Sequence, residues 1–114
     1  MIGFDLEHIS RVKDEERLLK KIATTDEIAY IEKFKNRKEK VVSLWAVKEA
    51  VFKCLNVESG SFSFKDIELK HLENGAPIII LHGKAKELTK GQHVEISLSH
   101  TKDIVGAVAV LVKD

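Results

Sequence analysis

The stretch from Val41 to Leu55 constrains the fold more than any other part of the chain. It contains no Gly or Pro and is apolar on nearly all sides, which predicts a helix buried over most of its surface. Glu49 and Lys53 are among its few polar residues, and on a helix they project only about 40° apart. Because a buried carboxylate is costly unless it is paired or binds a metal, Glu49 either lies at a surface seam beside Lys53 or lines a site.

The length and charge of the chain limit the classes of protein it can belong to. Its 114 residues predict a single domain over residues 1–114. The net charge of +1 gives no general field for nucleic acid or for a membrane surface, and neither partner is expected. One cysteine, Cys54, excludes a disulfide within the chain and fits a cytoplasmic setting. We expect neither a signal peptide nor a membrane span.

The first third of the chain predicts a strand followed by two short helices. Ile2, Phe4 and Leu6 alternate with acidic residues over 2–9, which predicts a strand with one apolar face. A helix is expected to begin near residue 11 behind an N-cap at Ser10, with acidic residues early and lysines late. Residues 24–27, Thr-Thr-Asp-Glu, predict a capping box, and a helix over 26–34 would follow it.

The second half of the chain changes to strands. An Asn-Gly turn at 74–75 predicts a hairpin between its two neighbouring strands. Ala85 and Leu88 would face inward from a short helix, and the last strand, almost continuously apolar, is expected at the centre of the sheet. These patterns predict an α+β fold in which an antiparallel sheet packs against the long central helix. The elements expected here are strands over 62–72, 77–81, 94–99 and 104–112, and a helix over 83–90.

Three groups of residues could carry chemistry. Asp5 and Glu7 share one face of a strand, which suits a hard cation such as Mg²⁺, although the residues alone favour an exposed strand face with ordinary solvated acids. Glu49 and Lys53 form either an ordinary helix-surface ion pair or part of a site. His100, at a polar junction between two strands, is either a turn residue or a group for anion binding and acid–base chemistry.

Taken together, these residues resemble a known family. Residues 3–5, Gly-Phe-Asp, and residues 45–53, Trp-Ala-Val-Lys-Glu-Ala-Val-Phe-Lys, resemble the two-part signature of the 4′-phosphopantetheinyl transferases. The short length, Arg11, the Asn-Gly-Ala-Pro turn at 74–77 and the Ser-Leu-Ser-His segment at 97–100 are similar to the small bacterial type, the holo-[acyl-carrier-protein] synthases. The resemblance covers essentially the whole chain.

The resemblance implies a reaction: the 4′-phosphopantetheine arm of coenzyme A is transferred to a serine of apo acyl carrier protein, and 3′,5′-ADP is released. It implies that Asp5 and Glu49 hold Mg²⁺ against the pyrophosphate and that Lys53 lies near the phosphates. Lys48, in the same motif, is grouped with the residues that bind coenzyme A. Asp5, Glu49 and Lys53 are thus the expected catalytic residues.

The same resemblance implies further contacts. His100 and Thr101 match a segment that contacts coenzyme A, and Arg11 with the helix after it matches the surface that meets the acidic carrier protein. The family's small members are trimers with the site between subunits, so a homotrimer is expected. The function would support fatty acid synthesis in the cytoplasm.

One position departs from the small bacterial pattern. That pattern commonly has Glu three residues after the aspartate, where this chain has His8, and Glu7 comes one position earlier. The pattern Gly-x-Asp-x-Glu resembles the larger, two-lobed transferases, in which the second acid is a metal ligand, and we therefore expect Glu7 to contribute to the metal site. Two other functions stay open on the residues alone: a non-catalytic α+β binding domain, and a different metal-dependent phosphotransferase or hydrolase. A nucleic-acid binder is disfavoured by the balanced charge and few aromatic residues.

Overall fold

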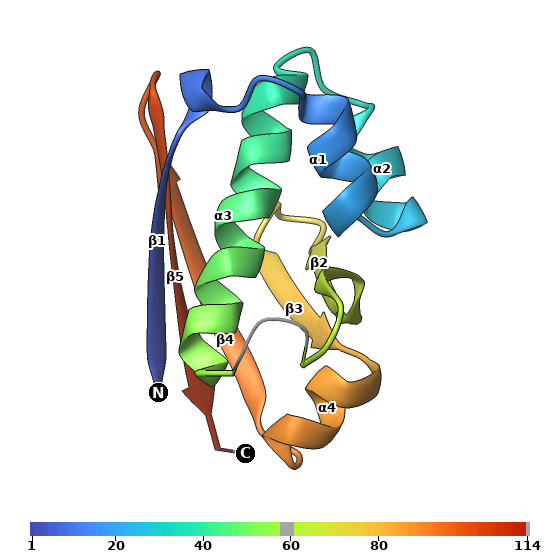
Figure 1. The fold of residues 1–114 in the computed structure, drawn as a ribbon, viewed down its shortest axis with the longest axis vertical. Coiled ribbons are helices and arrows are strands. Elements are labelled where there is room, and N and C mark those ends of the chain that lie inside the picture. Colours follow the sequence, from blue (N-terminus) through green and yellow to red (C-terminus); the bar gives the residue numbers. More distant parts are fainter. Residues whose placement is uncertain (58–60, 114) are drawn as a thin grey trace.

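A computed structural model describes residues 1–57 and 61–113 of the chain (Figure 1). The long helix α3 lies between a three-stranded sheet on one side and the shorter helices with a two-stranded hairpin on the other (Figure 1). The elements, in chain order, are β1 (Ile2–His8), a 3₁₀ turn (Ile9–Arg11), α1 (Glu15–Ile22), α2 (Thr25–Ile31), α3 (Arg37–Leu55), a second 3₁₀ turn (Phe64–Asp66), β2 (Ile67–His71), β3 (Pro77–Leu81), α4 (Gly83–Thr89), β4 (His93–His100) and β5 (Ile104–Val112).

Every strand pairing is antiparallel, as the sequence predicted. The larger sheet has the order β1-β5-β4, so the apolar last strand is its central strand. The strands β2 and β3 form a separate hairpin. The α+β class and the central position of β5 are therefore confirmed, and the strands divide into two sheets.

The central helix is buried on most sides, as its apolar sequence predicted. Its core-facing side chains are almost fully enclosed by the sheet, the hairpin and α4. The helix starts at Arg37, four residues before the apolar stretch, because the polar segment ahead of it forms the exposed first turn. It ends at Asn56, whose left-handed conformation closes the last turn. The most deeply buried side chains on α3 belong to Val41, Val42, Ala46, Val47, Lys48, Ala50 and Val51.

The faces of β1 are arranged in an unusual way. Its apolar side chains Ile2, Phe4 and Leu6 are 69%, 56% and 60% exposed, whereas Gly3 and Asp5 face α3 and are buried. Gly3 makes this possible, because a Cβ at its position would come within 3.0 Å of backbone atoms of α3. The strand backbone therefore lies directly against the helix, and this contact brings Asp5 to the helix surface.

Several local predictions for helix ends need correction. The helix α1 begins at Glu15 and not near residue 11, and its N-cap is Asp14, whose carboxylate accepts a hydrogen bond from the Arg17 N–H at 3.1 Å. Ser10 instead lies within a 3₁₀ turn that follows β1 directly. That turn is held to the β4–β5 connection by a hydrogen bond from the Ile9 N–H to the Asp103 carbonyl.

The other short helices also differ in detail from the prediction. The capping box at Thr24 and Glu27 is confirmed, but α2 ends at Ile31, before Phe34. In α4, Ala85 faces the core as expected, whereas Leu88 is exposed and the neighbouring Thr89 is buried in its place. The strand expected from residue 62 begins only at 67, because the 3₁₀ turn precedes it. In the described part of the chain, no helix combines the length and apolarity that crossing a membrane requires.

A buried ion pair joins the helical side of the fold to the hairpin. The Lys48 side chain is 0% exposed, and its ammonium donates hydrogen bonds to Glu27 Oε1 at 2.7 Å and to the carbonyls of Ile22 and Phe64. The Glu27 carboxylate also accepts the backbone N–H of Leu69 in β2, at 2.7 Å. Burial lowers the pKa of Lys48, and the charge and hydrogen bond of Glu27 oppose that shift. The pair thus ties α2, α3 and β2 together.

We expect Lys48→Met to destabilise the protein by roughly 3–5 kcal/mol, because it leaves the buried Glu27 charge without its partner. Urea denaturation followed by circular dichroism measures the change in the free energy of unfolding. The exposed Lys20 on α1 is the matched control, and Lys20→Met should change stability by less than about 0.5 kcal/mol. A loss at Lys48 no larger than the loss at Lys20 would contradict the role given to the pair.

Candidate functional site

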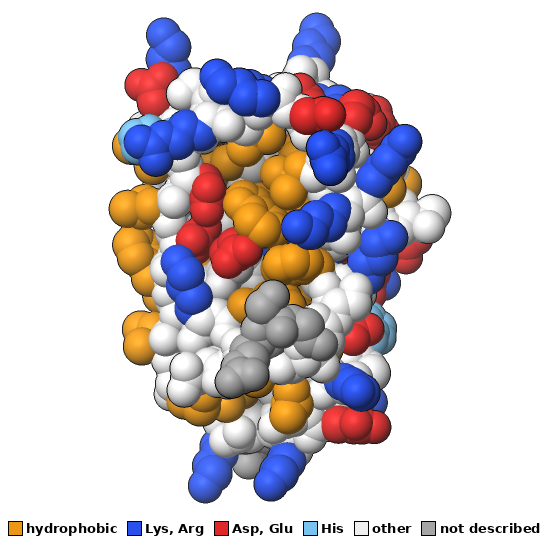
Figure 2. Space-filling model, viewed as in Figure 1, with side chains coloured by type: hydrophobic (Ala, Val, Ile, Leu, Met, Phe, Trp, Pro, Cys, Tyr) orange, Lys and Arg blue, Asp and Glu red, His pale blue; other side chains and the backbone are white. Residues whose placement is uncertain are grey.

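The seam between β1 and α3 brings together four of the residues singled out in the sequence. Asp5 and Glu7 lie on the face of β1 that meets the helix, and Glu49 and Lys53 follow one another, one turn apart, on α3. In Figure 2, acidic side chains gather between β1 and α3 beside an apolar hollow, with basic side chains around it. The structure therefore assembles the acidic pair of the strand and the polar stripe of the helix into one site.

Asp5 is the most enclosed member of this site, with 5% of its surface exposed. Its Oδ1 accepts a hydrogen bond from Lys53 Nζ at 2.8 Å, and the same ammonium donates to the Phe4 carbonyl at 3.2 Å. Its Oδ2 is buried and has no hydrogen-bond partner among the described residues. A buried carboxylate oxygen without a partner is costly, so this atom is suited to a cation or a water molecule.

The other two carboxylates are shifted toward their protonated forms. Burial, the adjacent carboxylate of Asp5 and the charge of Glu49 raise the pKa of Glu7 to about 7, against the opposing charge of Lys53. Burial, followed by the charge of Asp5, raises the pKa of Glu49, while Lys53 and Lys21 oppose the shift. The site therefore holds more negative charge than its lysines neutralise.

This arrangement fits a hard divalent cation. Within residues 1–57 and 61–113, no three Asp, Glu, His or Cys side chains are already gathered as a ready ligand set. Mg²⁺ does not require one, since it typically takes one or two protein carboxylates and completes its shell with water and substrate phosphates. The free Oδ2 of Asp5 and the nearness of the Glu7 and Glu49 carboxylates, whose pKa values are raised first by burial and then by Asp5, suit a cation at this place.

Lys48 is not part of this group. Its side chain leaves α3 on another side, and its ammonium is enclosed by Glu27, Ile22 and Phe64. The neighbours Lys48 and Glu49 thus have different surroundings, one in the core and one at the seam. The sequence had grouped Lys48 with the coenzyme A-binding residues, and the structure gives it a buried structural contact.

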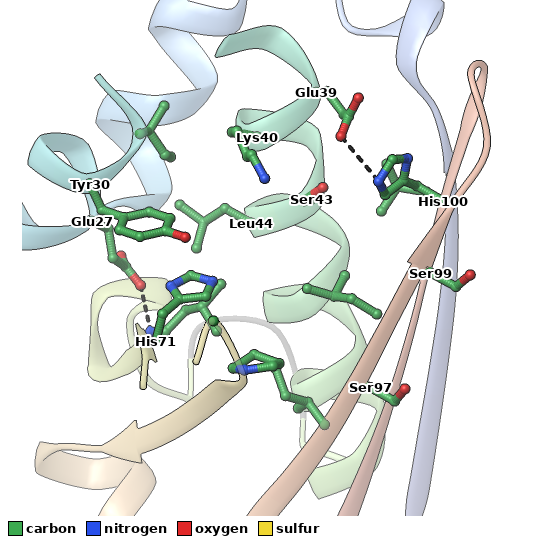
Figure 3. Close-up of a pocket in the computed structure, with 17 residues that line it drawn as sticks. Glu27, Tyr30, Glu39, Lys40, Ser43, Leu44, His71, Ser97, Ser99 and His100 are labelled. Carbon is green, nitrogen blue, oxygen red and sulfur yellow. Dashed lines mark hydrogen bonds and ion pairs between the residues drawn. The ribbon is translucent and has the colours of Figure 1, made fainter. Parts of the chain in front are cut away.

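A separate cavity of about 370 Å³ lies between α2, the first half of α3, the β2–β3 hairpin and β4 (Figure 3). The rings of Tyr30 and His71 stack in its wall, with centroids 4.1 Å apart and planes 7° apart. Lys40 and His100 also line it, and His100 Nε2 lies 3.4 Å from the carboxylate of Glu39. Burial and the charge of Lys40 lower the pKa of His71.

Thr101 has a local role at the end of β4. Its N–H donates to the Ile104 carbonyl at 2.9 Å, and its hydroxyl accepts the N–H groups of Asp103 and Ile104. Thr101 therefore shapes the β4–β5 turn that presents His100 to the cavity. The two residues lie together, as their adjacency requires, and both are exposed.

The cavity and the carboxylate site lie on opposite sides of α3. Lys40 and Glu49 are nine positions apart, which is about two and a half helical turns. Sequence reasoning missed the cavity, because Tyr30 and His71 are far apart in the chain and no motif joins them. The local signals were the turn at 74–77, which contributes Gly75 and Pro77 to the cavity wall, and the segment 97–100, which contributes His100.

Comparison with known proteins gives a consistent result. The sequence profile of the 4′-phosphopantetheinyl transferase superfamily matches residues 1–109. A holo-[acyl-carrier-protein] synthase of Clostridium acetobutylicum is 34% identical over 117 aligned positions, which cover 96% of this chain and 94% of that protein.

Solved structures agree with the sequence match. The holo-[acyl-carrier-protein] synthase of Helicobacter pylori in complex with coenzyme A superposes with a TM-score of 0.84 at 28% identity, over 97% of this chain and 99% of that one. The Bacillus anthracis holo-(acyl-carrier-protein) synthase, in complex with coenzyme A (3′,5′-ADP), superposes with a TM-score of 0.85 at 28% identity, over 99% of this chain and 96% of that one.

The unusual pKa of Glu7 predicts a pH effect in the metal-free protein. Because its pKa rises from 4.5 to about 7 on folding, the folded state binds the proton more tightly than the unfolded state. This group therefore makes the protein less stable as pH rises from about 4.5 to 7, and Glu7→Gln should remove that part of the slope. Urea denaturation of the wild type and of Glu7→Gln across this pH range, in the presence of a metal chelator, tests this prediction.

A direct measurement complements the denaturation series. The side-chain carboxyl carbon of Glu7, followed by NMR in chelator, should titrate near pH 7, and Asp5→Asn should lower that midpoint by removing a neighbouring charge. A Glu7 midpoint near 4.5 in the wild type would show that the three carboxylates do not share a crowded site.

Proposed function

The chain belongs to the 4′-phosphopantetheinyl transferase superfamily, and on this premise we propose that it acts as a holo-[acyl-carrier-protein] synthase. It would transfer the phosphopantetheine arm of coenzyme A to a serine hydroxyl of apo acyl carrier protein, leave 3′,5′-ADP, and so support fatty acid synthesis. The observation that carries this proposal is the site at the β1–α3 seam, where Asp5, Glu49 and Lys53 meet beside Glu7. A cytoplasmic location fits the lone, unpaired Cys54.

We propose that Asp5 and Glu49 hold Mg²⁺ and that Glu7 contributes to the same site. Asp5 offers the free oxygen Oδ2 from a rigid, buried position on the strand, and Glu49 faces it from the helix. When bound, Mg²⁺ would neutralise the pyrophosphate of coenzyme A and stabilise the charge that develops on 3′,5′-ADP. Such a reaction requires positioning and charge neutralisation more than a protein nucleophile.

The remaining roles follow from position. Lys53 is half exposed at the edge of the site and can donate to a phosphate oxygen. The serine proton needs an acceptor, and we assign it to Glu49, which is only partly buried and lies on the open side of the helix. We assign Lys48 to holding the fold, since its donors are already directed to Glu27 and two carbonyls.

The cavity on the other side of α3 is suited to the nucleotide end of coenzyme A. The stacked rings of Tyr30 and His71 offer an aromatic wall for a base, and Lys40 and His100 offer positive or hydrogen-bonding groups for a phosphate. Its volume of about 370 Å³ is in the range of small-molecule pockets. We therefore propose that His100 contacts coenzyme A and that Thr101 acts by shaping the turn beside it.

One chain cannot present both halves of this site to one coenzyme A, because α3 separates the cavity from the carboxylates. The exposed apolar side chains of β1 give a reason for the chain to associate with itself, since Ile2, Phe4 and Leu6 form a row on the outer face of the sheet. We propose that three copies pack through this face and that each site combines the carboxylates of one chain with the cavity of another.

The acceptor protein would approach along α1. Arg11 lies just before this helix, and Arg17, Lys20 and Lys21 are exposed on it. Lys21 is close enough to influence the pKa of Glu49, so the helix borders the carboxylate site. A basic surface at this place would steer an acidic carrier protein to the site despite the small net charge.

We expect the wild-type protein, incubated with apo acyl carrier protein, coenzyme A and Mg²⁺, to add one phosphopantetheine to the carrier, as weighed by mass spectrometry. Asp5→Asn should lower the rate by about 100-fold, because it removes a charged ligand without changing side-chain size. The control Asp26→Asn, on the exposed first turn of α2, should stay within about twofold.

Two outcomes would favour the other functions. No mass gain with folded wild-type protein would support a binding domain without activity. Breakdown of coenzyme A in the absence of any carrier protein would support a different phosphotransferase or hydrolase. An Asp5→Asn variant as active as the wild type would remove the proposed metal site from the mechanism.

We expect the wild type to have three times the mass of one chain by light scattering after gel filtration, and Leu6→Asp to shift it to the monomer. Leu6 is 60% exposed in a single chain, so a charge there disturbs the contact between chains and not the core. Leu88 on α4 is 49% exposed, and Leu88→Asp is the matched control that should leave the mass unchanged. A monomeric wild type would contradict the shared site.

A further inference from the structure

We propose that the ammonium of Lys53 acts as an internal substitute for the metal ion: it occupies the cation position beside Asp5 in the metal-free protein and has to leave it when the metal binds. The inference rests on the proposed metal site and concerns a step before any substrate is present. It makes Lys53 a competitor of the metal as well as a phosphate-binding residue.

The fixed partner in this contact is Asp5. Its side chain is 5% exposed, and its strand is held on one side by the pairing with β5 and on the other by the close approach of Gly3 to α3. One carboxylate oxygen is taken by Lys53 at 2.8 Å and the other has no partner in the described part of the chain. Of the two carboxylate oxygens with which Asp5 could bind a cation, one is therefore already occupied by the Lys53 ammonium.

The movable partner is Lys53. Its side chain is 52% exposed, and it extends from the last turn of α3 along the surface of the seam. Among the residues that the structure describes, its ammonium is hydrogen-bonded only to Asp5 and the Phe4 carbonyl, both on β1. The ammonium can therefore swing into solvent without any change in the core, in contrast to the enclosed ammonium of Lys48.

Electrostatic repulsion disfavours the presence of the Lys53 ammonium and a divalent metal ion at the Asp5 carboxylate at the same time. A lysine ammonium in contact with Asp5 repels a divalent ion at the same carboxylate, and the repulsion is strong because the site is partly removed from water. In the metal-free protein, however, the same ammonium stabilises three crowded carboxylates, and its charge opposes the raised pKa values of Glu7 and Glu49. Lys53 thus keeps the empty site folded at the cost of metal affinity.

The exchange has a consequence for the order of binding. Once the ammonium has left Asp5, its three donors are free at the edge of the site, where a phosphate would arrive. Metal binding therefore prepares Lys53 for the substrate, and the two binding events become cooperative through this one side chain.

The test measures the metal alone. Mn²⁺ is titrated into the metal-free protein at pH 8, and free Mn²⁺ is counted by electron paramagnetic resonance. Lys53→Met should bind Mn²⁺ about tenfold more tightly than the wild type, which corresponds to ~1.4 kcal/mol. The control Lys21→Met removes a charge that also acts on Glu49 but is not hydrogen-bonded to Asp5, and it should change the affinity by less than about threefold. Melting curves confirm that both variants are folded.

A second measurement follows Lys53 in the wild type by NMR. Without metal, its two ε-protons should have distinct shifts because the ammonium is fixed, and saturating Mg²⁺ should merge them at the position of an unrestrained lysine. Unchanged or weaker Mn²⁺ binding by Lys53→Met, equal effects of Lys53→Met and Lys21→Met, or ε-protons that stay distinct in Mg²⁺ would each overturn the inference. None of these results depends on transfer to a carrier protein, so failure of the proposed function is detected separately.

Discussion

The buried contact between Lys48 and Glu27 is the interaction on which the other parts of the structure depend. Both charges are removed from water, and they are compensated by each other, by two carbonyls, and by the N–H groups of Thr24 and Leu69. One carboxylate thereby caps a helix, pairs with a second helix and binds the middle of strand β2. With Lys48 directed into this contact on one side of α3, the neighbouring Glu49 lies on the side of the helix that meets β1.

The fold was predictable wherever the information is local. The apolar stretch of α3, the Thr24–Glu27 capping box and the antiparallel hairpins each depend on neighbouring residues, and each is present. The prediction failed where distant parts of the chain decide. Ser10 lies in a turn whose first residue, Ile9, is hydrogen-bonded to the Asp103 carbonyl, so α1 starts later than expected. The outward orientation of the apolar face of β1 likewise depends on Gly3, which allows the other face onto α3.

The candidate site likewise has a part that the sequence predicted and a part that it did not. The resemblance to the transferase family grouped Asp5 with Glu49 and Lys53 although the two parts of the motif are far apart in the chain, and strand alternation placed Glu7 beside Asp5. The motif could not show that Lys48 belongs to the core, since its partner Glu27 is remote in sequence. The aromatic wall of the cavity had no sequence signal at all, because it exists only where α2 meets the hairpin.

The close approach of Gly3 to α3 sets the width of the seam, and with it the span between the carboxylates of Asp5 and Glu49. In the proposed site, this span would bear on the size of the cation that both carboxylates could contact. Mg²⁺ needs oxygen ligands at about 2.0–2.1 Å, whereas Ca²⁺ accepts them at about 2.3–2.6 Å. Any side chain at position 3 would push the strand away from α3, so a residue without charge or functional group sets how near the Asp5 carboxylate comes to the helix.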